Sequence, residues 1–364
     1  MAKEISYDAI NENVFRQLFK DKFARFAFLI LVLMYSLVFL AQFISPYDKH
    51  YSDREQSYAP PSKIYIIDQN GKLSFPYTYN YVRHFDYENF DITYSEDKTQ
   101  KYYVKYFSKG EPYKLFGFIP FDRHFYNVEK GGKLYLLGTD INGRDNFSRL
   151  LYGGQISLTI GFLALFVSFP LGMLYGGISG YFGGKTDFVM MRISEAIMSI
   201  PSFYLLIILA SILPANMTSV QRFALIVIIL ALIGWAGFSR VVRGMVLSIK
   251  TREYVVAAEA MGASRLRTIV KHILPQTMSY VIIAMTLSVP SYILSESGLS
   301  FLGLGIQQPD ASWGNMLKEA QEFVNIISRP WLLAPGFLIF VAVLSFNLIG
   351  DTIRDILDPN SKER

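Results

Sequence analysis

The chain has 364 residues, of which 51% are hydrophobic and only 18% are charged, and its mean hydropathy is +0.26. This composition does not fit a soluble surface and is typical of a membrane protein. The chain has no cysteine, which excludes disulfides, thiolate catalysis and iron–sulfur clusters. Its four histidines lack metal-ligand spacing, so we expect no metal site. The net charge of +5 fits cytoplasmic loops of a membrane protein better than nucleic-acid binding.

Six stretches are apolar over the roughly 20 residues that a helix needs to cross a bilayer core about 30 Å thick. We therefore predict an all-α, multi-pass protein with six transmembrane helices in a lipid bilayer. The first stretch is too long for a signal peptide and no small-residue cleavage site follows it, so we expect an uncleaved span. The predicted spans are residues 27–44, a second within 150–184, a third between Glu195 and Arg222, then 223–239, a fifth between His272 and Glu296, and 331–350.

The distribution of Lys and Arg in the short connections predicts the orientation, because these residues stay in the cytoplasm. The N-terminal segment and the connection between spans four and five are rich in both. The connection between spans five and six has only Lys318 and Arg329, and that between spans three and four has only Arg222. We expect both termini in the cytoplasm and residues 45–149 outside.

Three regions follow from this division of the chain. Residues 1–44 comprise the first span and, at 8–22, either an amphipathic helix on the inner membrane face or a simple basic flank. Residues 45–149 form an external insert, rich in tyrosine and turn signals, with expected strands at 63–67 and 101–107. The insert is either a contact surface or a structural cap. Residues 150–364 form a five-span core.

Several small and charged residues near the membrane are candidates for helix packing, turns, ion pairs or a solute path. Gly172, Gly176 and Gly180 lie on one helix face and favour close packing of another helix, or else line a pore. The pair Gly183-Gly184 predicts a tight turn, since a phosphate-binding loop would need a preceding strand. Arg192 and Glu195 have the spacing of an ion pair. Glu296 is either an interfacial cap or part of a solute path.

Residues 253–264 predict a short alanine-rich helix ended by Gly262, followed by a basic amphipathic helix that leads into span five. Exposed small residues favour a close-fitting partner, although a plain linker helix would look similar. The stretch resembles the coupling motif of binding-protein-dependent ABC import permeases, with Val256 at the motif's glutamate position and His272 at its isoleucine position. The matching residues are Ala257, Ala258, Gly262, Leu274 and Pro275.

Three further segments resemble the C-type subunit of dipeptide and oligopeptide importers. Residues 137–153 are similar to the segment before its second span, although Gln155 stands where arginine is common. Residues 295–314 are similar to its external loop after span five, and 350–359 to its C-terminus. The insert is longer than in plain peptide-importer subunits.

The resemblance implies a type I ABC importer fold in the bacterial cytoplasmic (inner) membrane. The partners it implies are a homologous B-type permease forming a heterodimer, two ABC ATPase subunits that use ATP and Mg, and an external solute-binding protein. This chain would bind no cofactor and catalyse no reaction. The coupling helix near 253–265 would contact an ATPase, and the loop after span five would supply gate residues. The candidate residues are Ala257, Ala258, Glu259, Gly262, Ala263 and Ser264 for coupling, and Glu296, Gly298 and Trp313 for the external loop or gate.

Peptides are the expected solute, with nickel, glutathione, sugars or peptide antibiotics as alternatives. A stand-alone secondary transporter would need an inverted repeat and ionisable residues near the bilayer midplane, and the sequence has neither. A membrane-embedded enzyme would need a clustered constellation of reactive groups. His272 and Glu296 lie at opposite ends of one span and are too far apart to form one.

Overall fold

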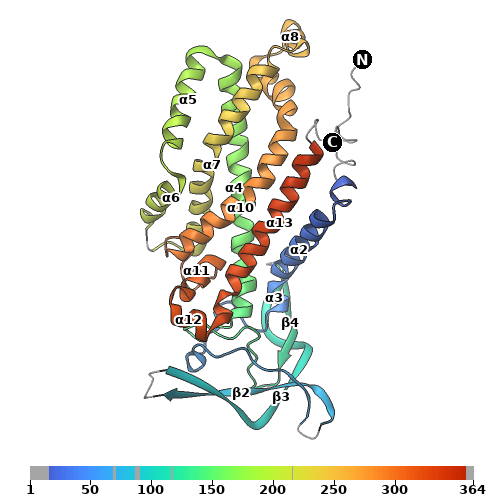
Figure 1. The fold of residues 1–364 in the computed structure, drawn as a ribbon, viewed down its shortest axis with the longest axis vertical. Helices are drawn as coiled ribbons and strands as arrows, with labels where there is room; N and C mark the ends of the chain where they lie inside the picture. The colour runs from blue at the N-terminus through green and yellow to red at the C-terminus, as the bar shows by residue number, and fades with distance from the viewer. Residues whose placement is uncertain (1–15, 69–70, 87–90, 116–117, 215, 358–364) are drawn as a thin grey trace. The chain divides into compact units, whose positions relative to one another are not determined.

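Five helices are long and apolar enough to cross a membrane in this computed structural model, which describes residues 16–68, 71–86, 91–115, 118–214 and 216–357. They confirm the first, second, fourth, fifth and sixth predicted spans, with ends that differ by several residues (Figure 1). The predicted amphipathic helix at 8–22 lies mostly outside the described residues. The five helices are α2 (Lys22–Phe39), α4 (Asn146–Phe182), α7 (Ser219–Ile249), α10 (Met278–Phe301) and α13 (Ala334–Leu357).

The third predicted span is not one straight helix. In place of a single span between Glu195 and Arg222, the chain forms α5 (Gly184–Met198) and α6 (Ser202–Ser211), which are bent by 79°. Pro201 has no backbone N–H and disfavours helical backbone at the residue before it, which accounts for the break. The described residues thus hold six spans if the bent pair is one of them.

The described residues group into two compact units. The helical unit comprises residues within Met1–Leu31, Thr159–Leu299 and Phe340–Arg364, and the sheet unit comprises Val32–Leu158 and Ser300–Ile339. In the helical unit, α5 and α6 both pack against α7.

The three spaced glycines of α4 confirm the packing interpretation. A Cβ atom on Gly176 would lie 2.3 Å from the carbonyl oxygen of Ser239, and one on Gly180 would lie 2.7 Å from that of Arg243. Both carbonyls belong to α7, so only glycine allows the two helices this close. Just beyond α4, Gly183 and Gly184 have φ angles of 63° and 54°, which confirms the tight turn.

The connection between α7 and α10 holds α8 (Glu253–Ala260) and α9 (Arg265–Arg267). The predicted basic helix after Gly262 is present and leads into α10, but it is irregular, because α9 passes into a π turn (Thr268–Ile273) and a 3₁₀ turn (Leu274–Thr277). Pro275 cannot donate a backbone hydrogen bond and crowds the preceding turn, so the helix widens there.

The sheet unit contains the predicted β-rich insert as one antiparallel sheet of order β1-β2-β3-β4. The strand expected at 63–67 is β1, and the strand expected at 101–107 lies within the much longer β3, which pairs with β2 along its first part and with β4 along its second. Tyr77, Thr78 and Tyr79 of β2 are all buried, so the strand is covered on both of its faces at this point. The strands are β1 (Tyr65–Ile67), β2 (Leu73–Asp86), β3 (Asp91–Leu115) and β4 (Ile119–Val128).

Short helices complete the sheet unit. The four residues of α3 pack on β3 and β4. The connection between α10 and α13 folds into a series of helical turns. These short elements are α3 (Ala41–Ile44), η1 (Arg54–Gln56), α11 (Trp313–Leu317), η4 (Lys318–Gln321), α12 (Phe323–Ser328) and η5 (Pro330–Leu333).

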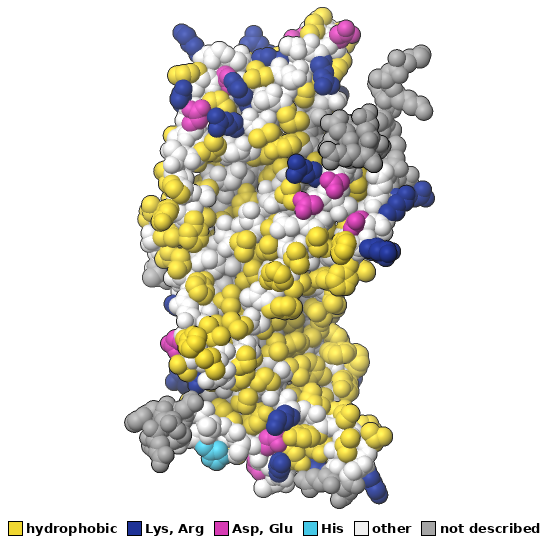
Figure 2. Space-filling model, viewed as in Figure 1, with side chains coloured by type: hydrophobic (Ala, Val, Ile, Leu, Met, Phe, Trp, Pro, Cys, Tyr) yellow, Lys and Arg dark blue, Asp and Glu magenta, His cyan; other side chains and the backbone are white. Residues whose placement is uncertain are grey.

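Large apolar side chains cover the outside of the long helices. Phe23 and Phe26 of α2 and Phe337 and Phe340 of α13 are all exposed. Figure 2 shows hydrophobic side chains along the helices that face the viewer. A soluble protein rarely exposes so much apolar surface, so these faces are suited to lipid or to a partner within the membrane.

Candidate functional site

The alanine-rich helix α8 presents one face to its own chain and one face outward. Val255 and Ala258 are buried, and α8 contacts the π turn Thr268–Ile273. Ala257 lies on the opposite, exposed face. Of the alanine pair in the predicted motif, therefore, Ala258 anchors the helix to its own chain and only Ala257 is available to a partner.

Gly262 ends α8 with a specific backbone geometry. Its φ angle is +86°, its N–H donates to the carbonyl of Glu259 at 2.9 Å, and the N–H of Ala263 donates to the carbonyl of Ala258 at 3.0 Å. This pair of hydrogen bonds is the Schellman C-cap, which needs a left-handed residue. No atom lies within 4 Å of a Cβ built on Gly262. Backbone conformation, rather than lack of space, thus requires glycine here.

The exposed face of α8 and the turn after it combine small and apolar residues. Ala257, Glu259, Gly262 and Ser264 are exposed, and Ala263 is half-buried. Val256, Met261 and Leu266 expose 54%, 83% and 61% of their side chains around them. Figure 2 shows hydrophobic and acidic side chains side by side at the α8 end. An apolar patch with small residues at its centre suits a protein partner.

Polar contacts join α8 to the end of α4. The Tyr181 hydroxyl donates to the Glu259 carboxylate at 2.5 Å. The Lys250 ammonium, at the end of α7, donates to the carbonyls of Gly180 at 2.9 Å and Tyr181 at 3.2 Å. The Arg265 guanidinium lies 5.7 Å from the ring centre of Phe182. These contacts hold α8 and the ends of α4 and α7 together.

A second set of contacts ties α4, α5 and α7 together nearby. The Asp187 carboxylate accepts hydrogen bonds from the Arg243 Nε at 2.9 Å and from the Ser179 hydroxyl at 2.6 Å. Arg192 and Glu195 form the predicted ion pair at 2.8 Å. That pair is largely exposed and contributes little, whereas Asp187 links three helices and keeps them in fixed relation.

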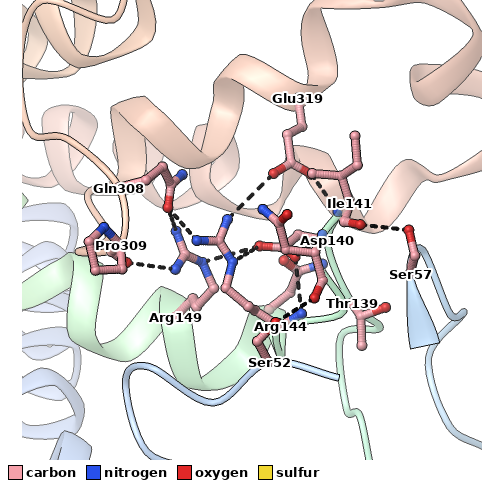
Figure 3. A network of polar contacts seen from close by, with 12 residues as sticks. Ser52, Ser57, Thr139, Asp140, Ile141, Arg144, Arg149, Gln308, Pro309 and Glu319 are labelled. Carbon is pink, nitrogen blue, oxygen red and sulfur yellow. Dashed lines mark hydrogen bonds and ion pairs between the residues drawn. The ribbon is translucent and has the colours of Figure 1, made fainter. Parts of the chain in front are cut away.

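A buried polar network lies in the sheet unit (Figure 3). The Asp140 carboxylate accepts from Arg144 Nε at 2.6 Å and lies 3.5 Å from Arg149 Nε. Both arginines also donate to the side-chain oxygen of Gln308, and Arg149 donates to the Pro309 carbonyl at 3.1 Å. The network joins the segment before α4 to the connection after α10, which are more than 150 residues apart in sequence.

Glu319 of η4 extends this network. Its carboxylate accepts from the backbone N–H of Ile141 at 3.0 Å and lies 3.9 Å from Arg144 Nη2. Burial, reinforced by the negative charge of Asp140, raises the pKa of Glu319 to about 7. Burial also raises the pKa of Asp145 to about 7, although hydrogen bonds from Ser148 act to lower it. Two carboxyl groups of this unit therefore titrate close to neutral pH.

The three predicted gate residues lie in different surroundings. Trp313 is fully buried in the sheet unit, where its indole N–H donates to the Leu150 carbonyl at 2.9 Å. Glu296 and Gly298 belong to α10 in the helical unit, where Glu296 is fully buried and a Cβ on Gly298 would lie 3.2 Å from Phe203. This placement gives Trp313 the surroundings of a structural anchor. Whether any of the three acts as a gate stays a prediction.

Sequence reasoning missed the polar network, although it singled out the two segments that build it. No local pattern pairs Asp140 and Arg144 with Gln308 and Glu319, because their contact depends on the tertiary fold. In the described part of the chain, no group of three His, Asp or Glu side chains is arranged to hold a metal ion.

These spans and connecting helices are those of a multi-pass membrane protein. Residues 168–363 match the family model described as the binding-protein-dependent transport system inner membrane component, and the chain belongs to this family. Residues 12–61 match the N-terminal TM domain of oligopeptide transport permease C. The chain is therefore a transport permease subunit rather than a catalytic enzyme.

Named relatives agree with the predicted C-type resemblance. The dipeptide transport system permease protein DppC of Bacillus subtilis is 44% identical over 61% of this chain and 68% of its own length. The oligopeptide transport system permease protein OppC of Haemophilus influenzae is 42% identical over 63% and 71%. OppC of Bacillus subtilis is 39% identical over 64% and 73%. The resemblance is thus confirmed.

Proposed function

We propose that this chain is one permease subunit of an ATP-driven peptide importer. It would pair with a homologous B-type permease, two ABC ATPase subunits and an external solute-binding protein. The observation that carries the proposal is the outward face of α8, where Ala257 and Gly262 are surrounded by exposed apolar side chains. The permease relatives named for dipeptides and oligopeptides support peptides as the solute.

The proposed mechanism needs α8 to move as a rigid body. The C-cap at Gly262 fixes the end of α8, and the Tyr181–Glu259 contact connects α8 to α4. Lys250 at the end of α7 holds the same end of α4. Closure of the ATPase pair on ATP and Mg would displace α8, and these contacts would pass the displacement to the spans. The chain itself would bind no nucleotide or other cofactor. Glu259 would thereby attach α8 to α4. It does not stand at the motif's glutamate position, which Val256 occupies.

The proposed location is the bacterial cytoplasmic (inner) membrane with both termini in the cytoplasm. The concentration of Lys and Arg between α7 and α10 supports this orientation. It would place the sheet insert outside, where a solute-binding protein docks. Leu73 and Phe75 of β2 are 86% and 81% exposed, so the insert has apolar surface for such a contact.

Reconstitution of the complete transporter tests this function. The chain, its B-type partner, both ATPases and the binding protein are placed in proteoliposomes, and uptake of labelled di- and oligopeptides is followed with ATP and Mg. We expect uptake that requires the binding protein and ATP. Uptake of nickel or glutathione in place of peptides would contradict the assignment of the solute, and uptake without ATPases would contradict the importer assignment.

A further inference from the structure

A cavity of about 400 Å³ opens at the surface of the helical unit, beside the break between α5 and α6. Its walls come from both sides of this break, from α7 and from α10. The volume falls in the range of sites for small organic solutes, about 300 to 1,000 Å³. Nothing in the predicted motifs pointed to this place.

The lining of the cavity is uncharged. None of its described lining residues is Asp, Glu, Lys, Arg or His. The polar groups are mostly hydroxyls of α10, from Ser288, Ser291, Tyr292 and Ser295, which recur at steps of three and four residues and so share one helix face. Apolar side chains such as Leu206 and Leu230 form much of the remaining wall.

Two of the four hydroxyl protons of this face are already used within α10. Ser288 donates to the carbonyl of Ala284 and Ser295 donates to that of Ser291, both at 2.7 Å. A hydroxyl has one proton and two lone pairs, so these oxygens offer acceptors to a solute. Such a wall favours a solute that brings N–H donors.

The broken backbone beside the cavity is an independent observation. Within a membrane, irregular backbone is tolerated where protein buries it or where it lines a cavity, and discontinuous helices often mark the solute site of a transporter. Ile200, Pro201 and Ser202 of the break line this cavity. On the facing side, a Cβ at Gly234 would lie 2.1 Å from the Tyr292 hydroxyl, so glycine is needed to leave room for the tyrosine.

We infer that this cavity holds the amide backbone of the transported solute through hydroxyl acceptors and makes no charged contact with its side chains. The inference rests on the proposed function and narrows its solute class. A nickel ion would require carboxylate or imidazole ligands, and this wall offers neither. An uncharged peptide backbone matches the wall, and peptides with different side chains share that backbone.

A charge placed in the cavity after assembly tests the inference. Because the chain has no cysteine, Ser291→Cys provides a single thiol when cysteines of the partner subunits are replaced. The assembled transporter is treated with a thiol reagent carrying either a sulfonate or a trimethylammonium group. Uptake of lysine-containing and glutamate-containing tripeptides is then measured relative to trialanine.

Unmodified transporter should take up all three peptides to a similar extent. The sulfonate should raise the ratio of lysine to glutamate peptide about tenfold, which corresponds to about 1.4 kcal/mol, and the trimethylammonium should lower it as much. Ser279→Cys, at an exposed serine of α10 outside the cavity, is the matched control and should show no change. If Ser291→Cys fails to assemble, Ser288→Cys tests the same wall one turn away.

An unchanged ratio after complete modification at Ser291, or an equal change at Ser279, would overturn the inference while leaving peptide import intact. ATP hydrolysis without uptake of any peptide by the unmodified transporter would instead refute the proposed function. The two failures are therefore distinguishable in one experiment.

Discussion

The α8 end of the helical unit and the Asp140–Arg144 network of the sheet unit use polar residues in opposite ways. Around α8, side chains are exposed, apolar groups face outward and the few polar contacts lead back to α4. In the network, both arginines are buried and share acceptors from two distant segments. The first arrangement suits a surface that engages and moves, and the second suits a structure that stays fixed.

The largest effect is expected at the end of α8. Gly262→Ala places a side chain at φ +86°, which costs about 1 to 2 kcal/mol and disturbs the C-cap. We expect peptide uptake to fall by about five- to thirtyfold, as this cost implies, while membrane insertion is retained. Gly244→Ala is the matched control, since Gly244 also has open space around it but lies within α7 without a positive φ angle. Loss of uptake in both variants, or in neither, would contradict the role of the cap.

The buried network should dominate the stability of the sheet unit. Arg144→Met leaves Asp140 and Glu319 without one cationic partner, and removal of one partner from a buried charge pair costs about 3 to 5 kcal/mol. Thermal unfolding in detergent measures the loss. Arg192→Met breaks an exposed pair and should cost less than about 1 kcal/mol. Similar melting temperatures for the two variants would show that the network is not a stabilising structure.

A moderate effect is expected where α8 joins α4. Tyr181→Phe and Glu259→Gln each weaken the same hydrogen bond, so either should lower uptake per ATP hydrolysed by about fivefold, equivalent to about 1 kcal/mol. The double variant should be no worse than the single variants, because the contact is already lost. Additive losses would mean that the two residues act separately.

A separate effect concerns the dependence of stability on pH. Glu319 has a pKa raised from 4.5 to about 7, so between these values the folded chain binds a proton that the unfolded chain has lost. Stability therefore falls as pH rises from about 4.5 to 7. Glu319→Gln should flatten this part of the dependence of melting temperature on pH. A curve unchanged by the substitution would assign the dependence to Asp145, whose pKa is raised similarly.

The difference between the two regions also explains what the sequence could predict. Long apolar runs and the Gly262 motif are local patterns, and the spans, the α8 helix and its glycine cap follow from them. The α5–α6 break lies at Pro201, and an apolar run alone does not locate it. The burial of Ala258 and the Arg144–Gln308 contact depend on which segments meet in the fold, so no spacing rule reveals them.

A single cysteine in place of Ser264, which is exposed beside α8, tests most directly the claim that α8 contacts an ATPase subunit. The cysteine-free chain carrying Ser264→Cys is crosslinked in native membranes with its partners, and mass spectrometry identifies the attached protein. Ser328→Cys, exposed at the end of α12, serves as the control. We predict an ATPase subunit attached at position 264, altered in yield by ATP, and none at 328. A folded, expressed chain without an ATPase attached at 264 would contradict the proposed coupling role of α8.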